Sequence, residues 1–107
     1  MLEKWTQQIE KCEVLDAKYD KHTLFWVLEV RSAKGHQWTV VFTHGIGYRD
    51  VEWRVLTRDE NGYWQKHASG VIDLNGKRRS YPQTVIDAVK FFRKTVLPHV
   101  LTMYPEF

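Results

Sequence analysis

The fold is decided by the segment HQWTVVFTH, residues 36–44. Its even positions carry Trp38, Val40 and Phe42 between two histidines, while its odd positions are mostly polar. A repeat of two residues with one apolar face is typical of a half-buried β-strand. The segment therefore predicts a sheet that packs one of its faces against a core.

The preceding segment, TLFWVLEV at residues 23–30, is apolar on both faces. Its aromatic and β-branched residues favour a strand. One face carries the even-numbered residues from Leu24 to Val30, and the other carries Phe25 and Val27. A strand that is apolar on both sides needs cover on both sides. We therefore expect an apolar patch that the N-terminal helix or a second chain covers, made of Phe25, Val27, Val41 and Leu56.

Further strands are expected on either side of these two, connected by short turns. The glycine-containing loop at residues 44–50 precedes one of them, and Asn75-Gly76 favours a type I′ turn because both residues tolerate positive φ. In that hairpin Asp73 would face Arg78. The segments expected as strands are 12–19, 51–56, 63–69 and the two arms of the hairpin at 71–74 and 77–79.

Helices are expected at both ends of the chain. Residues 2–12 place Leu2, Trp5, Ile9 and Cys12 at helical spacing. Near the other end, Ser80-Tyr81-Pro82-Gln83 has the form of a capping box that would begin a long helix. Pro98 is expected to interrupt that helix because it has no backbone N–H. The apolar stripe of this helix is expected to comprise Val85, Val89, Phe92 and Val96, widened by Ile86 and Leu97.

Together these patterns predict an α+β fold. The chain would form a short N-terminal helix, an antiparallel meander of five to six strands, and a long C-terminal helix packed on one sheet face. Within that helix, Val89 and Phe92 are expected to pack on Trp38, Val40 and Trp53. At 107 residues, a single domain spanning 1–107 is the expectation.

Composition narrows the class of protein. The chain is 43% hydrophobic and 27% charged, which is typical of a globular protein and not of a disordered one. No apolar run approaches the ~18 residues of a membrane span, and the first residues do not resemble a signal peptide. The one cysteine, Cys12, excludes an internal disulfide and fits a reducing compartment. We therefore expect a cytoplasmic protein without membrane contact.

No pattern indicates catalysis or a cofactor. The five histidines lack the compact spacing of zinc ligands, and His36 and His44 lie about 26 Å apart along an extended strand. Cys12 ends an apolar stripe and resembles a small core residue rather than a nucleophile. Gly45-Ile46-Gly47 connects two strands, whereas a dinucleotide-binding loop needs a helix after it. We expect no catalytic residue, no metal and no cofactor.

Charge and aromatic residues give the candidate sites. Residues 61–107 carry seven basic and three acidic residues, whereas residues 1–60 carry nine and ten. Basic clusters are typical of phosphate binding, and exposed aromatic residues can stack on bases or anchor a protein interface. The candidate macromolecule-binding residues are the basic Lys77, Arg78, Arg79, Lys90, Arg93 and Lys94, together with Tyr48, Arg49, Tyr63 and Trp64.

Two functions follow as expectations. The first is a small non-enzymatic accessory or regulatory protein, such as an inhibitor, that binds another protein or a second copy of itself through an aromatic-rich sheet surface. The alternative is a nucleic-acid-binding domain that uses the basic surface between Lys77 and Lys94. A small-molecule enzyme ranks below both, because no catalytic constellation is present in the sequence.

Overall fold

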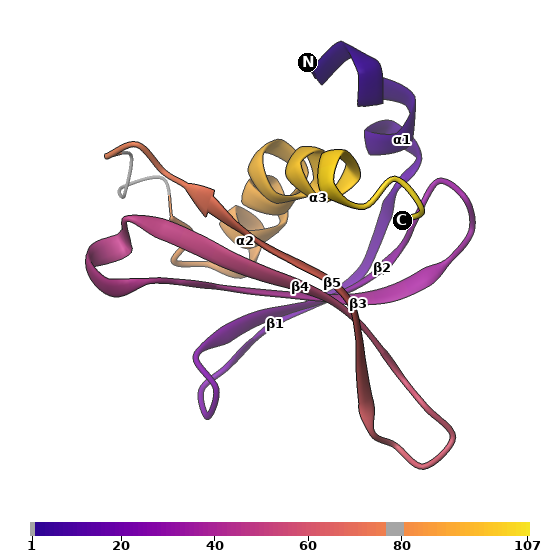
Figure 1. Ribbon diagram of the computed structural model, residues 1–107. Coiled ribbons are helices and arrows are strands. Elements are labelled where there is room, and N and C mark those ends of the chain that lie inside the picture. The colour runs from indigo at the N-terminus through magenta and orange to yellow at the C-terminus, as the bar shows by residue number, and fades with distance from the viewer. Residues whose placement is uncertain (1, 77–80) are drawn as a thin grey trace.

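The protein is a five-stranded antiparallel sheet with its N-terminal and C-terminal helices on the same side (Figure 1). The structure, a computed structural model, describes residues 2–76 and 81–107. The strands lie in chain order and are β1 (Glu13–Asp20), β2 (Phe25–Arg31), β3 (Gln37–His44), β4 (Asp50–Arg58) and β5 (Trp64–Asp73). The predicted α+β class and meander are confirmed.

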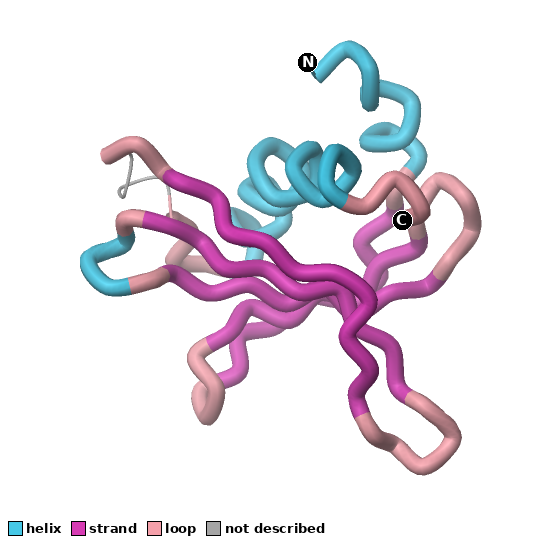
Figure 2. The backbone as a smooth tube through the Cα atoms, in the orientation of Figure 1, coloured by secondary structure: helices cyan, strands magenta, loops and turns pink. Residues whose placement is uncertain are grey.

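The helices form two groups. The N-terminal group is η1 (Leu2–Trp5) followed by α1 (Thr6–Lys11), and the loop between β3 and β4 contains the short turn η2 (Ile46–Tyr48). The C-terminal group is one continuous helical stretch made of α2 (Val85–Phe91), η4 (Phe92–Val96) and α3 (Leu97–Met103). Figure 2 shows both groups above the sheet.

The core lies between the sheet and the C-terminal helices. Alternation along β2, β3 and β4 sends every second side chain to the helix side, as period-two strands require. Trp53 and Phe42 are fully buried there, and Trp53 faces Phe42 across β3 and β4. The other buried strand residues of this core are Trp26, Leu28, Val30, Trp38, Val40, Val51 and Val55.

The start of the C-terminal helix differs from the prediction. The helix begins at Val85, and Thr84 is its N-cap: the Thr84 hydroxyl accepts a hydrogen bond of 3.1 Å from the backbone N–H of Asp87. The helix therefore does not begin at the predicted capping box of residues 80–83, of which Ser80 lies outside the described residues. Thr84 is a suitable N-cap because its backbone lies in the β region and its hydroxyl accepts from a free N–H group of the first turn. Asp87 in that turn interacts favourably with the helix dipole.

The predicted apolar stripe is also partly wrong. Val85 and Ile86 are 47% and 68% exposed, whereas Ala88 and Phe91 are buried. The cause is η4, a stretch of π-helix that shifts the register within the helix. Phe92 is fully buried in one core with Trp38, Val40 and Trp53, as expected, but Val89 is only half-buried and lies outside that core.

Pro98 does not interrupt the helix. It lies at the second position of α3, and the helix continues to Met103. The π-helical turn immediately precedes it. Because a π-turn already departs from the regular α-helical hydrogen bonds, the missing N–H of Pro98 is accommodated there.

The predicted hairpin at residues 71–79 is corrected in part. Residues 64–73 form one continuous strand, β5, which pairs with β4 and places Asp73 opposite Asp50. Asn75 and Gly76 have φ values of 50° and 80°, so the positive φ expected at both is confirmed. The second arm at 77–79, and with it the pairing of Asp73 with Arg78, lies outside the described residues.

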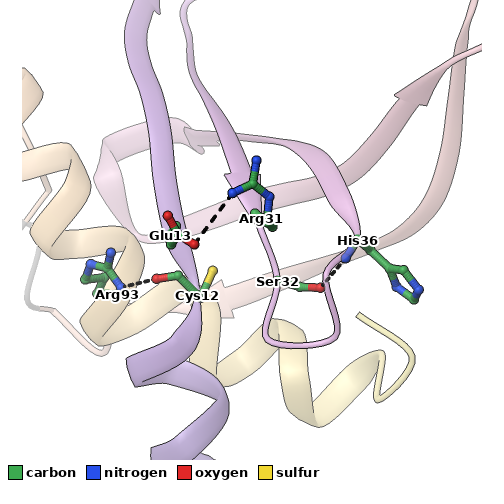
Figure 3. Close-up of polar contacts among 6 residues, drawn as sticks. All are labelled: Cys12, Glu13, Arg31, Ser32, His36 and Arg93. Carbon is green, nitrogen blue, oxygen red and sulfur yellow. Dashed lines mark hydrogen bonds and ion pairs between the residues drawn. The ribbon is translucent and has the colours of Figure 1, made fainter.

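The N-terminal helix is fastened to the C-terminal helix rather than to the opposite sheet face. The Arg93 guanidinium donates a hydrogen bond of 2.8 Å to the carbonyl of Cys12 (Figure 3), and the Trp5 indole N–H donates one of 3.2 Å to the Thr102 hydroxyl. Cys12 itself is buried. These contacts place the N-terminal helix on the same side of the sheet as the C-terminal helix. Within the described residues, the opposite face of the sheet is therefore left without a helix, and we call it the free face.

Candidate protein interface

The free face lies between two bent hairpins. Figure 1 shows the tips of the β1–β2 and β4–β5 hairpins bending away from the helices, so the face between them is open. Residues that alternate with the core residues point to this side. Phe25, Val27, Val41 and Leu56 are among them, and they form the apolar strip of the free face.

The strip is contiguous across three strands. Val27 on β2 faces Val41 on β3, and Leu56 on β4 faces the neighbouring Thr39. Phe25, Val27 and Leu56 are half-buried. Because no helix of the described residues covers these side chains, their remaining apolar surface is available to a partner.

An arginine–aromatic pair closes each end of the strip. At one end the Arg54 guanidinium lies 5.4 Å from the centre of the Phe25 ring, and at the other Arg58 lies 4.3 Å from Trp64. Arg and aromatic residues are enriched among the residues that dominate binding energy at interfaces. Neither arginine was identified from the sequence, because strand alternation shows only their face and not the cross-strand register that brings them to an aromatic ring.

Arg54 is held in place before any partner binds. Its Nη2 lies 2.7 Å from Glu52 Oε1, and its Nε lies 3.2 Å from the same oxygen. Arg54 faces Val41 across the β3–β4 pair and reaches Phe25 on β2. Its aliphatic stem therefore crosses the strip, which explains why Val41 is only 9% exposed without a helix above it.

Polar groups lie beside the strip. The Thr39 hydroxyl lies 2.8 and 2.9 Å from the two carboxylate oxygens of Glu29 and donates to that carboxylate. Glu29 and Thr39 line a shallow depression of about 410 Å³ together with Leu56, Arg58 and Trp64. The free face thus combines an apolar centre, fixed charges of both signs and a depression, which suits a protein surface better than a phosphate backbone.

The structure does not gather the predicted aromatic candidates into one patch. Tyr63 and Trp64 lie at the β4–β5 turn and are 71% and 47% exposed. Tyr48 and Arg49 precede β4 at its other end. Because β4 has nine residues, the two pairs are separated by roughly 30 Å. Of these four residues, Trp64 lines the depression on the free face.

The basic candidates are dispersed as well. Lys90 and Lys94 are exposed on the C-terminal helix, which lies on the other side of the sheet. Arg93 is half-buried and its guanidinium donates to backbone carbonyls of the N-terminal segment. Lys77, Arg78 and Arg79 lie outside the described residues.

The groups that could carry other chemistry have structural positions. Burial raises the pKa of the Cys12 thiol to about 11, so it is a protonated thiol at neutral pH. Within residues 2–76 and 81–107, no three His, Cys, Asp or Glu side chains gather as metal ligands would. The helices of this same part of the chain include none that is long and apolar enough to cross a membrane.

Comparison with known proteins gives no relative from which a function could be transferred. No protein-family model, curated protein or solved structure matches the chain. The free face and its residues are therefore the basis for the function.

Proposed function

We propose that the protein is a small non-enzymatic accessory or regulatory protein that binds another protein through the free face of its sheet. The observation that supports this most is the apolar strip with its two arginine–aromatic pairs, on a face that no helix of the described residues covers. Such a surface offers burial at its centre and oriented charges at its rim, which are the features of protein interfaces.

The charges of the free face favour a protein over a nucleic acid. Arg54 is paired with Glu52, and Glu29 adds a carboxylate beside the strip. These two carboxylates would repel a phosphate backbone, whereas a protein partner can pair with charges of both signs. Nucleic-acid binding through Lys90 and Lys94 is therefore the alternative outcome of the experiment below. The proposed location is the reducing interior of a cell, because the chain has one cysteine and no disulfide framework.

Affinity capture with matched variants tests the proposal. Leu56→Asp places a charge in the apolar strip, and Ile86→Asp makes a comparable change at an exposed helix residue on the other side of the sheet. We expect the wild type and Ile86→Asp to capture the same protein from native lysate, with or without nuclease, and Leu56→Asp to lose it.

Two other results would count against this function. Capture that disappears with nuclease but survives Leu56→Asp would indicate nucleic acid. Capture by all three forms alike would show that the free face takes no part. Sedimentation of the pure protein tests whether the partner is a second copy of the chain. In that case the wild type is a dimer and Leu56→Asp converts it to a monomer.

A further inference from the structure

Five aromatic side chains surround a pocket at one end of the sheet, on the helix side. Tyr19 ends β1, Trp26 begins β2, His44 ends β3, Tyr48 lies in the β3–β4 loop and Tyr81 precedes α2. The pocket that they line has a volume of about 270 Å³. It is slightly smaller than the about 300–1,000 Å³ of sites for drug-sized ligands, so it suits a single small ring.

The rings of these side chains pack on one another. The His44 and Tyr48 rings stack with centres 3.8 Å apart, and Tyr81 stands edge-on to His44 at 5.0 Å. Tyr19 stands edge-on to Trp26 at 5.1 Å. Aromatic pairs at such distances and angles stabilise one another.

Two buried polar groups of this pocket have no hydrogen-bond partner. The indole N–H of Trp26 has none, and the side chain is 4% exposed. The hydroxyl of Tyr81 lies among Thr43 and the backbone of His44 without forming a hydrogen bond of good geometry, and Tyr81 is 6% exposed. Buried donors without partners are rare and costly in native proteins, so two in one pocket call for a missing acceptor.

The residues that line the pocket limit which class of ligand could supply this acceptor. An indole N–H can only donate, and burial raises the pKa of Tyr81, so its phenol stays protonated and can donate as well. Among the described residues, those that line the pocket include no carboxylate, lysine or arginine. A cation such as methyl-lysine would meet inward donors, and a nucleotide would find no charge for its phosphate among these residues.

We propose that this pocket binds a proline-containing peptide segment in the polyproline II conformation. Such a segment has no internal hydrogen bonds, so its carbonyl oxygens are free to accept from Trp26 and Tyr81. Its pyrrolidine rings pack on aromatic faces, and little chain entropy is lost because the helix is already extended. This pocket offers aromatic walls for the rings and a tryptophan N–H for a carbonyl oxygen.

Tyr48 supplies a route into the pocket. The two unpartnered atoms are buried, so a ligand must move part of the wall to reach them. Tyr48 has a φ of 57° and follows Gly47 at 70°, a left-handed conformation that is unfavourable for a tyrosine. A loop held in such a conformation is suited to a second arrangement in which the Tyr48 ring moves aside.

This proposal concerns a different surface from the free face and does not rest on the function proposed for it. Its test is titration of the whole protein with an oligoproline peptide, followed by the indole N–H signals in two-dimensional NMR. We expect saturable binding, with the Trp26 N–H signal shifting downfield as it gains an acceptor. Trp26→Phe keeps a ring but removes the donor, and it should weaken binding about tenfold.

Trp38→Phe is the matched control. The Trp38 indole N–H is also buried without a partner, but this side chain stacks on Phe107 at the other end of β3. Its replacement should leave peptide binding unchanged. If Trp26→Phe does not fold, Tyr19→Ala, which removes a wall beside Trp26, should weaken binding while Tyr63→Ala, at the distant β4–β5 turn, should not.

Three results would overturn the proposal. They are no saturation at millimolar peptide, binding that Trp26→Phe or Tyr19→Ala leaves unchanged, and binding of a single-stranded oligonucleotide or a trimethyl-lysine peptide in preference to oligoproline. Since Leu56→Asp changes neither the walls nor the donors, peptide binding should survive in that variant. The two proposals can therefore fail separately.

Discussion

The indole N–H of Trp53 donates a hydrogen bond of 2.9 Å to Nδ1 of His99. Trp53 is fully buried on β4 and His99 lies on α3, so this bond fastens the helix to the middle of the sheet. Because Nδ1 accepts here, the ring is neutral and its proton is on Nε2. Burial lowers the pKa of His99, which keeps the ring neutral further into the acid range.

Stability is therefore expected to fall in mild acid. Since the folded pKa lies below the unfolded value, the unfolded state takes up a proton from His99 first as the pH falls through about 6.5. The contribution of His99 is complete above that pH and is lost progressively as the pH falls toward the folded pKa. Urea denaturation at a series of pH values measures this loss.

His99→Gln isolates the contribution of this one histidine. A glutamine does not titrate, so the variant should lose less stability than the wild type between neutral pH and pH 5. His22 is exposed, and His22→Gln should keep the slope of the wild type. Equal slopes for His99→Gln and the wild type would show that His99 is not linked to folding.

Trp53 leaves no room for a side chain at Gly70 on β5. Gly70 faces Trp53 across the β4–β5 pair, and a Cβ at this position would lie 2.6 Å from Trp53 Cζ2. Trp53 is buried and bonded to His99, so it has little freedom to move. Gly70→Ala should reduce the free energy of unfolding by about 1–3 kcal/mol. Its neighbour Ser69 is exposed, and Ser69→Ala should change stability by less than about 0.5 kcal/mol.

The C-terminal helix allows a test within a single turn. Phe92 is fully buried, whereas Lys90 is exposed two residues earlier. Phe92→Ala should cost about 3–5 kcal/mol of unfolding free energy because it leaves a cavity in the core. Lys90→Ala should change it by less than about 0.5 kcal/mol. Equal stabilities in urea would mean that the helix presents a different face to the sheet.

Most of the sheet could be predicted from the sequence because period-two alternation is local. Each strand shows its own pattern, and short turns leave few ways to connect antiparallel neighbours. The helix details could not be predicted in the same way. The π-helical turn at Phe92–Val96 shifts the register without any local marker, and it is this shift that accommodates Pro98.

The candidate sites were harder to predict because they depend on contacts between distant segments. The apolar strip follows from alternation, but Arg54 and Arg58 join it only through the register of β4 with its neighbours. The pocket of Tyr19, Trp26, His44, Tyr48 and Tyr81 draws on five separate segments. Arg93, by contrast, has the appearance of a surface charge in the sequence and is instead a structural donor.

Arg93 should hold the N-terminal helix in place. Its guanidinium donates to the carbonyl of Cys12 and, at 3.4 Å, to that of Ile9. Arg93→Ala leaves these carbonyls without their donor, so backbone amides in residues 6–12 should exchange with deuterium faster than in the wild type. The adjacent Lys94 is exposed, and Lys94→Ala should leave this exchange unchanged. Unchanged exchange in Arg93→Ala would show that other contacts hold the helix.

Val55 and Leu56 are neighbours on β4 that point to opposite faces of the sheet. Val55 is fully buried beneath the helices, and Leu56 is half-buried on the free face. The most direct test that one face is core and the other is free for a partner is the unfolding free energy of Val55→Ser and Leu56→Ser in urea. We predict a loss of about 2 kcal/mol or more for Val55→Ser and of less than about 1 kcal/mol for Leu56→Ser. Equal losses, or a greater loss for Leu56→Ser, would contradict the existence of a free face.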